Sequence, residues 1–197
     1  YSRSDDNDLN LNSKLRDTTV QYCCFYQCAA DDVGKGYGYG SALIISSKQV
    51  TLFLSSALDC ANPDRVSRGA HFEILSDNIS SSNLNMTNGL SLYGGFIEYR
   101  KTDFGFFKLS TLYNSSCMYV TAFTTSNEVE MQYCNFIQNK IKDSDGFGDL
   151  PAMIFIIQSP FTISNCIFLL NEFGSGARIA IMNTVTGVIP LINCYAD

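Results

Sequence analysis

QYCCFYQC, at residues 21–28, returns almost unchanged as QYCNFIQN at residues 132–139. Both segments carry Gln, Tyr and Cys in succession, then a Phe two residues after that Cys, and a second Gln two residues after the Phe. Two further copies follow: ISNCIFLLN at residues 163–171 and LINCYAD at residues 191–197. A motif that recurs in this way indicates a repeat architecture, in which each copy is one structural unit.

A second pattern separates these copies. It begins with a small or flexible residue, continues with alternating apolar positions and ends at a polar residue. Its six copies start at Ala42, Ala70, Gly95, Met118, Ala152 and Ala177, with spacings of 28, 25, 23, 34 and 25 residues. Each copy has the length and the β-branched content of a strand. The chain lacks clean helical periodicity and a leucine-rich repeat pattern, which excludes those two kinds of repeat.

The two patterns together predict an all-β protein, a parallel β-helix (β-solenoid) of about six coils over residues 18–197. Residues 1–17 are polar and are expected to form an N-terminal linker or cap. The last copy stops in mid-repeat at Asp197, so we expect the chain to continue or a neighbouring subunit to stack on the open C-terminal coil. Inward residues of successive coils should lie above one another, and the expected core ladder is Cys23, Phe25, Cys134, Phe136, Cys166, Phe168 and Cys194.

Composition and charge exclude some classes of function. The 197-residue chain is 46% hydrophobic and 16% charged, with 13 basic and 19 acidic residues and a net charge of −6. A nucleic-acid-binding protein needs a basic surface, so we exclude a nucleic acid partner. The most apolar window, residues 153–170, is interrupted by Gln158, Ser159 and Pro160, which predicts two buried strands joined by a corner and no membrane span.

The eight cysteines do not form the paired CxxC spacing of a zinc site, and the chain has a single His. No zinc and no other cofactor is therefore expected. Cysteine packs well as a small buried residue, which accounts for the members of the core ladder. Cys24 and Cys28 have no such repeated position and are candidates for a disulfide or a reactive thiol.

Parallel β-helices include polysaccharide lyases and glycoside hydrolases, so the carboxylates were searched for a catalytic pair. Glu73 and Glu98 take matching places, three residues after Ala70 and Gly95, and Thr121, Phe155 and Ala180 follow on later rungs. Both carboxylates are expected to face outward without an Arg, Lys or His cluster beside them, with the lone His71 on the same side as Glu73. This is a poor match to a glycosidase pair, in which one carboxyl group is kept protonated, and we expect no enzyme activity.

Two other sets of residues are candidate sites. Asp143, Asp145 and Asp149 lie in IKDSDGFGDLP, residues 141–151, and resemble a calcium loop in composition, but no Glu follows at the twelfth place. A solvated insertion between coils is the expected structure there. Three asparagines begin glycosylation sequons and would mark an extracellular surface if modified: Asn78, Asn85 and Asn114.

CCFYQC, the strand SALIIS and the later C-x-F-x-x-N copies together resemble the right-handed parallel β-helix repeats of large surface-protein families in parasitic flagellate protists. They are also similar to the polymorphic outer membrane protein repeats of bacteria. The resemblance covers residues 18–197 and implies a non-enzymatic surface or structural role within a longer chain. One departure is that the paired glycines of the commonest pattern remain only as Gly94 and Gly95.

Three hypotheses about function follow. The first is a module of a cell-surface, adhesin-like protein that presents flat sheet faces to a protein partner or a glycan. The second is an intracellular structural component of a filament or cytoskeletal assembly, in which free thiols would be stable. The third, which we expect least, is a carbohydrate-active lyase or hydrolase acting through Glu73 and Glu98.

Overall fold

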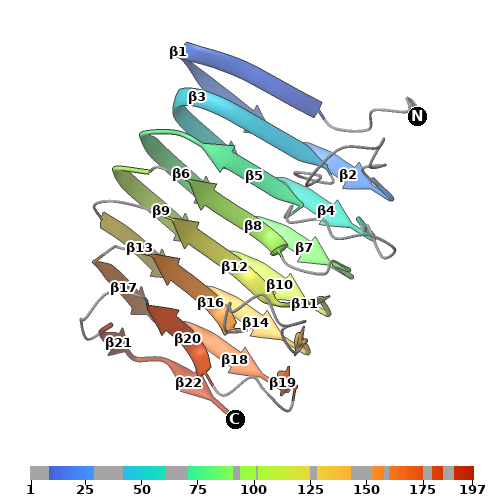
Figure 1. Ribbon diagram of the computed structural model, residues 1–197. Helices are drawn as coiled ribbons and strands as arrows, with labels where there is room; N and C mark the ends of the chain where they lie inside the picture. Colours follow the sequence, from blue (N-terminus) through green and yellow to red (C-terminus); the bar gives the residue numbers. More distant parts are fainter. Residues whose placement is uncertain are drawn as a thin grey trace.

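The computed structural model describes residues 9–28, 42–60, 71–90, 94–100, 102–124, 128–142, 152–157, 160–174, 179–183 and 189–197 (Figure 1). Every regular element in these ranges is a β-strand, and every strand pair is parallel. The chain is therefore the all-β parallel β-helix that its repeats predict. Within the same ranges, no helix has the length and apolar character needed to cross a membrane.

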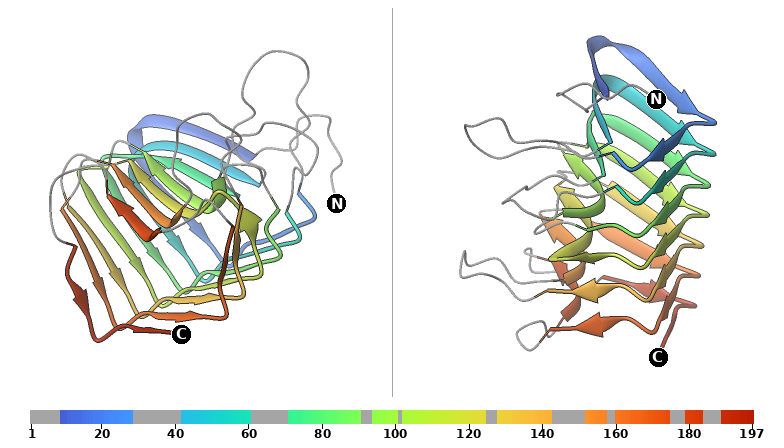
Figure 2. Two further views of the ribbon diagram at one scale, coloured as in Figure 1. Left: turned by 60° about the horizontal axis from the view of Figure 1, so that its bottom comes forward. Right: turned by 90° about the vertical axis from the view of Figure 1, so that its right-hand side faces the viewer.

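The strands form faces that run the length of the solenoid, with equivalent strands of successive coils side by side (Figure 2). Two long strands bend across the first and second faces: β1 (Leu9–Gln21) and β3 (Leu43–Phe53). The first face continues from β3 through β5 (Phe72–Leu75), β8 (Gly94–Arg100), β12 (Tyr119–Thr124), β16 (Ala152–Ile157) and β20 (Ile179–Asn183). The second face continues through β6 (Asn78–Ser82), β9 (Phe104–Lys108), β13 (Glu128–Gln132), β17 (Phe161–Ser164) and β21 (Leu191–Ile192).

The third face consists of short strands that carry the repeated cysteine motif. They are β2 (Cys24–Tyr26), β4 (Ser56–Leu58), β7 (Asn85–Thr87), β10 (Thr111–Tyr113), β14 (Asn135–Ile137), β18 (Ile167–Leu169) and β22 (Tyr195–Ala196). A small additional sheet contains β11 (Ser116–Cys117), β15 (Lys140–Ile141) and β19 (Glu172–Phe173). The described part of the third face has seven strands, one for each coil, whereas six coils were expected. The additional coil contains β1 and β2, and it lacks the strand pattern beginning with a small residue from which the six coils were counted.

Two predictions about individual segments can be compared with these strands. The apolar window of residues 153–170 is divided among three strands, β16, β17 and β18, one more than the two expected, because a second corner at Asn165, with φ of 53°, separates β17 from β18. Residues 9–17, expected in a linker or cap, belong to β1, which pairs with β3 from Leu9 onward.

Backbone corners explain why the motif repeats. Tyr22 and Gln27 both have positive φ, at 55° and 51°, and so do Tyr133 and Gln138, at 54° and 53°. Other coils place non-glycine residues with positive φ at the same two corners: Leu54, Asp59, Asn83, Asn88, Leu109, Asn114, Asn165, Leu170 and Asn193. Each copy of the motif thus encodes one corner, a three-residue strand and a second corner.

The residue after the first corner bonds successive coils together. Cys134 donates from Sγ to the carbonyl of Gln132 at 3.3 Å, as Ser110 donates from Oγ to Lys108 at 2.9 Å. The backbone N–H of Cys134 donates in turn to Cys166 Sγ in the next coil at 3.4 Å. Cysteine therefore serves at this corner as a small side-chain donor and acceptor, in the way that serine does in other coils.

The interior is filled by rows of apolar side chains. Phe136 is fully buried and stacks on Phe168 in the next coil, with ring centroids 4.9 Å apart. Cys134 and Cys166 are also fully buried, whereas Cys23, Phe25, Phe168 and Cys194 are partly buried against the core. Close packing along these rows is what holds the coils in register.

Candidate functional site

The outer side of the second face is a flat array of side chains in register. One row runs across four coils through Gln49, Asn78, Phe104 and Glu128. The adjacent row runs through Thr51, Ser80, Phe106, Glu130 and Thr162. Side chains alternate strictly along these strands, as the buried and exposed positions of β6, β9 and β13 show. These two rows are therefore polar except at Phe104 and Phe106, and a further phenylalanine, Phe53, lies outward at the end of β3.

Those two phenylalanines form one wall of a shallow groove of about 220 Å³. The ring of Phe104 meets the ring of Phe106 edge to face, with centroids 4.9 Å apart, and Phe104 is 38% exposed. Gln49, Asn78 and Ser80 also line the groove, together with Val50 and Ile79, whose own side chains are buried on the inner side of the sheet. We call this hollow the aromatic groove.

Polar and charged groups surround the aromatic groove. Lys108 places its ammonium 5.4 Å from the centre of the Phe106 ring, a cation–π contact. On the neighbouring coil, Gln132 donates from Nε2 to Glu130 Oε2 at 3.3 Å. The arrangement offers an apolar ring face together with amide, hydroxyl and carboxylate groups. These groups can hold a ligand that has both apolar and hydroxyl surfaces.

Glu73 and Glu98 lie directly opposite each other on β5 and β8, as their spacing predicted. The expectation that they lack a basic neighbour is wrong. Arg100 donates from Nε to Glu98 Oε1 at 2.8 Å, and its NH1 nitrogen lies 3.2 Å from Glu73 Oε1. The expectation of simple outward exposure is also wrong, since Glu73 is only 3% exposed and Glu98 only 9%. One guanidinium that contacts both carboxylates favours a structural role, because it joins two neighbouring coils.

The later rungs of this row differ from the predicted ones at two places. Glu98 lies opposite Ala122 rather than Thr121, because the register between β8 and β12 shifts between Tyr119 and Thr121. Phe155 follows as predicted, and Met182 takes the place expected for Ala180. The described part of this row therefore adds no third carboxylate to the pair.

His71 is 1% exposed, and its ring packs edge to face against Phe96 with centroids 5.1 Å apart. Burial lowers the pKa of His71 to about 4, against a smaller raising effect from the backbone of Cys60. The imidazole is therefore neutral at physiological pH and is removed from solvent. It does not face outward beside the carboxylates as an accessible base would.

The three sequon asparagines are all on the surface. Asn78 lies in the aromatic groove, and Asn85 begins β7 on the third face. Asn114 is at a corner and donates from Nδ2 to Asn88 Oδ1 at 2.7 Å, while Asn88 donates in the same way to Asp59 at 2.7 Å. Asn114 is thus part of a hydrogen-bonded column of corner side chains, whereas Asn78 has the more open surroundings.

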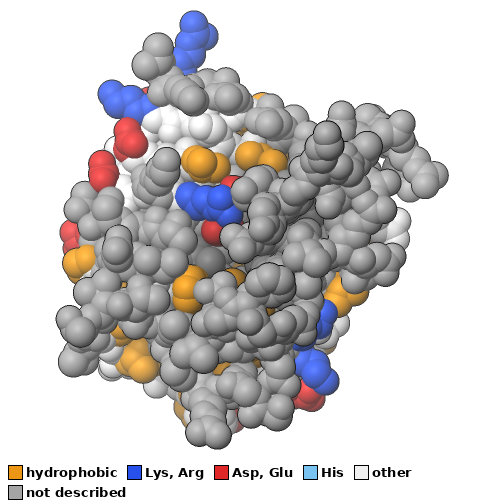
Figure 3. All heavy atoms as spheres, in the orientation of Figure 1, with side chains coloured by type: hydrophobic (Ala, Val, Ile, Leu, Met, Phe, Trp, Pro, Cys, Tyr) orange, Lys and Arg blue, Asp and Glu red, His pale blue; other side chains and the backbone are white. Residues whose placement is uncertain are grey.

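The proposed calcium loop cannot be compared with the structure, because Asp143, Asp145 and Asp149 lie outside the described residues. Among the residues that are described, no group of three His, Cys, Asp or Glu side chains is arranged to hold a metal ion. On the face that Figure 3 displays, the described basic side chains are scattered and form no continuous basic patch.

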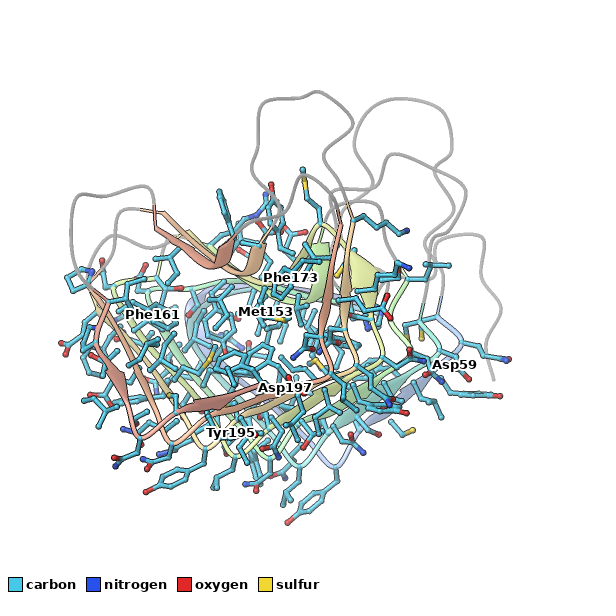
Figure 4. All side chains as sticks on the ribbon, turned by 90° about the horizontal axis from the view of Figure 1, so that it is seen from below. Asp59, Met153, Phe161, Phe173, Tyr195 and Asp197 are labelled. Atoms are coloured by element: carbon cyan, nitrogen blue, oxygen red, sulfur yellow. The ribbon has the colours of Figure 1, made fainter. Side chains whose placement is uncertain are left out.

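The C-terminal coil presents a second hollow, of about 340 Å³, around the last described strands. Figure 4 views the solenoid from this end and shows Met153, Phe173, Tyr195 and Asp197 around it. Phe173 is 42% exposed, and Tyr195 is 60% exposed. In the described part of the chain, no strand pairs with the outer edges of β20, β21 or β22. The hollow and these strand edges form a surface that we call the terminal coil surface.

Sequence reasoning did not find the aromatic groove or the role of Arg100. Phe104 and Phe106 lie at alternate positions in a short FGFFK segment, which was a visible signal of an exposed aromatic pair. Their partners Gln49 and Asn78 come from two other coils, so the groove exists only after the coils stack.

No protein-family model matches this sequence, and no significant match was found to a curated protein or to a solved structure.

Proposed function

We propose that this chain is a non-enzymatic interaction module of a cell-surface, adhesin-like protein, and that its aromatic groove binds a glycan. The observation that carries the proposal is the exposed pair Phe104 and Phe106 beside Gln49, Asn78 and Ser80. One side of a pyranose ring presents C–H groups that pack on an aromatic ring, and its edge presents hydroxyls that bond to amides. The groove offers both kinds of contact within a few side chains.

The dimensions of the aromatic groove suit weak contact with an extended chain of sugars. Its volume of about 220 Å³ is below the range of about 300–1,000 Å³ that is usual for an enclosed small-molecule site. A groove that remains open on one side buries only part of a sugar unit, so single contacts will be weak. Surface proteins commonly overcome weak contacts through several binding modules acting together.

The Glu73, Glu98 and Arg100 cluster supports the non-enzymatic part of the proposal. A retaining or inverting glycosidase needs one carboxyl group to carry a proton. Arg100 instead contacts both carboxylates, at 3.2 Å from Glu73 and 2.8 Å from Glu98, in an arrangement that joins two coils. The surface exposure of Asn78, Asn85 and Asn114 supports an extracellular or cell-surface location.

Glycan binding can be tested by NMR titration of bacterially expressed protein with neutral tetrasaccharides. We expect backbone amide shifts at Gln49, Asn78 and Phe104, and we expect Phe104→Ser to weaken binding about tenfold or more. Tyr113→Ser is the matched control, because Tyr113 is 36% exposed but lies on the third face. Shifts that are equal in both variants, or that fall elsewhere on the solenoid, would contradict the proposal.

The cell-surface location requires a different measurement, peptide mass spectrometry of the protein from its natural source. Glycans on Asn85 or Asn114 are the expected result, with Asn78 left unmodified because a glycan there would cover the aromatic groove. Bare asparagines together with fully reduced cysteines would instead favour the intracellular alternative.

That alternative is a structural component of a filament or cytoskeletal assembly, and the terminal coil surface favours it. Exposed apolar side chains and strand edges without a described partner would accept another coil from a neighbouring subunit. Sedimentation over a range of concentrations tests this alternative, with Tyr195→Glu predicted to abolish association and Tyr113→Glu, on the middle strand β10, to leave it intact. A protein that remains monomeric at all concentrations would exclude stacking of this kind.

A further inference from the structure

Cys28 and Cys60 occupy the same position in neighbouring coils. Their strands β2 and β4 pair in register from Cys24 to Tyr26, and the backbone N–H of Gln27 extends the pairing by donating to the carbonyl of Leu58 at 3.0 Å. Each cysteine follows a corner residue of positive φ, Gln27 at 51° and Asp59 at 53°. Tyr26 and Leu58 are paired, and each cysteine lies two residues after one of them, with the same backbone conformation between. Cys28 and Cys60 therefore occupy matching positions in the two coils.

Both thiols point toward the same corner of the solenoid. Cys60 is fully buried, and its Sγ lies 3.7 Å from the carbonyl of Phe25, which belongs to the coil of Cys28. It also lies 3.6 Å from the carbonyl of Leu58 in its own coil. Cys28 has the equivalent contact with the carbonyl of Tyr26, at 3.9 Å, and is partly exposed.

The spacing of coils suits a covalent bond between these thiols. Neighbouring strands of a sheet lie about 4.7–4.9 Å apart, and the Cα atoms of disulfide-bonded cysteines lie about 4.4–6.8 Å apart. Two matched cysteines on adjacent rungs therefore fall inside the range that a disulfide needs. Cys24 does not, because the residue in register with it is Ser56.

Later coils show what this position does. Asn139 Oδ1 accepts from the backbone N–H of Ser115 at 3.0 Å and from its hydroxyl at 2.9 Å. Asn171 Oδ1 accepts from the backbone N–H of Asn139 at 2.9 Å and from its Nδ2 at 3.1 Å. In these three coils the position after the second corner thus connects one coil to the next through side chains. The first two coils have cysteines in place of these asparagines.

We propose that Cys28 and Cys60 form a disulfide that joins the first two coils when the protein meets an oxidised low-molecular-weight disulfide such as glutathione disulfide. The Cys28 thiolate attacks one sulfur of the reagent and releases one glutathione thiolate, which leaves a mixed disulfide on Cys28. The Cys60 thiolate then attacks the Cys28 sulfur and releases the second glutathione. Two protein thiols are oxidised, one glutathione disulfide is reduced to two thiols, and the two protons leave with the products.

The order of attack follows from access and acidity. Cys28 is partly exposed and can meet the reagent, whereas burial raises the pKa of the Cys60 thiol to about 12. Cys60 is therefore a slow resolving thiol that reacts only when the mixed disulfide is held beside it. This inference is independent of the proposed glycan binding, because it involves a different corner of the solenoid.

Cys134 and Cys166 provide a control within the same chain. They too lie on adjacent coils, with the backbone N–H of Cys134 3.4 Å from Cys166 Sγ. Both are fully buried, so a glutathione molecule cannot reach either of them in the folded protein. Cys194 is partly exposed and matches Cys166 on the next coil, so it could react first and be resolved by Cys166. The control is therefore run in the Cys194→Ser protein, in which oxidation should join the Cys28–Cys60 pair and leave Cys134 and Cys166 as thiols.

The test is to equilibrate this variant, reduced and folded, with increasing ratios of oxidised to reduced glutathione, alkylate the remaining thiols and map the peptides by mass spectrometry. We expect a crosslinked Cys28–Cys60 peptide, alkylated Cys134 and Cys166, and a rise in Tm of about 5–10 °C. Cys28→Ser should abolish the crosslink and the rise in Tm, and Cys24→Ser should change neither.

Three outcomes would overturn the proposal. One is a Cys24–Cys28 crosslink in place of Cys28–Cys60. Another is glutathione on Cys28 that no second thiol displaces at any ratio. The third is a Cys28–Cys60 crosslink found only after denaturation. Cys60→Ser places a hydroxyl in the interior and can prevent folding, whereas Cys28 is partly exposed and its replacement by Ser leaves the interior intact. Cys28→Ser alone is therefore enough to test whether the crosslink requires this pair.

Discussion

Arg100 lies 3.2 Å from Glu73 in the preceding coil, and it donates to Glu98 in its own strand at 2.8 Å. The two carboxylates would otherwise face each other across adjacent rungs with little solvent around them. Arg100 thereby connects the two coils. The arrangement gives the first prediction.

Replacing Arg100 with Met should leave two buried carboxylates without their common partner. We expect the free energy of unfolding to fall by about 2–4 kcal/mol, somewhat less than for a fully buried pair because the Arg100 side chain is 26% exposed. Urea denaturation at pH 7 measures the change, with Lys108→Met as the control. If the two variants lose the same small amount, the cluster does not stabilise the fold.

Acidification should destabilise the protein through His71. Burial lowers the pKa of this residue in the folded state to about 4, from an ordinary value of 6.5. Between these two values the unfolded chain binds a proton that the folded protein excludes. The stability due to neutral His71 is therefore complete above pH 6.5 and is lost as the pH falls toward 4, by about 3 kcal/mol.

His71→Phe isolates this contribution, because Phe can keep the contact with Phe96 and does not titrate. Its unfolding free energy should fall less steeply than that of the unsubstituted protein between pH 7 and pH 4, when both are measured by urea denaturation. Parallel pH profiles for the two proteins would show that His71 is not buried in its neutral form.

The buried amide of Asn139 should make a large contribution to the free energy of unfolding. It accepts two hydrogen bonds from Ser115 and donates to the carbonyl of Leu112 at 3.0 Å. Asn139→Ala would leave those groups buried without partners, and we expect a loss of about 3–5 kcal/mol in urea denaturation. Asn135→Ala is the control, since this half-buried amide has one weak hydrogen bond of 3.4 Å, and a loss below about 1 kcal/mol is expected.

Two of the corners between strands are occupied by leucine, and replacing either leucine with asparagine should stabilise the protein. Leu54 and Leu109 have φ of 49° and 53° and are 47% and 52% exposed. Branched side chains are strained at positive φ, whereas Asn tolerates it. Leu109→Asn and Leu54→Asn should each raise the free energy of unfolding by about 0.5–1 kcal/mol.

Leu169→Asn is the comparison for the corner variants, because Leu169 lies within β18 and has no positive φ. It should give no gain in chemical denaturation. A gain of the same size at Leu169 would mean that surface polarity, and not the corner conformation, is responsible.

The sequence by itself determined the coil. Corner residues, inward Cys and Phe positions and small strand starts all recur with the period of one coil, and a local backbone conformation can be read from local residues. That is why QYC-x-F-x-Q predicted the stacked strands and why the spacing of Glu73 and Glu98 placed them opposite each other. These features depend on neighbours in the chain and on a rung-to-rung distance that every parallel sheet shares.

Other side-chain contacts between coils could be identified only from the tertiary structure. A register shift between Tyr119 and Thr121 moved Ala122 into the place predicted for Thr121, and no sequence pattern marks that shift. The aromatic groove, the ion pair from Arg100 to Glu73 and the match of Cys28 with Cys60 each join residues from different coils. Loops of unequal length separate the coils, so the residue that lies above another is fixed by packing of the whole interior and not by distance along the chain.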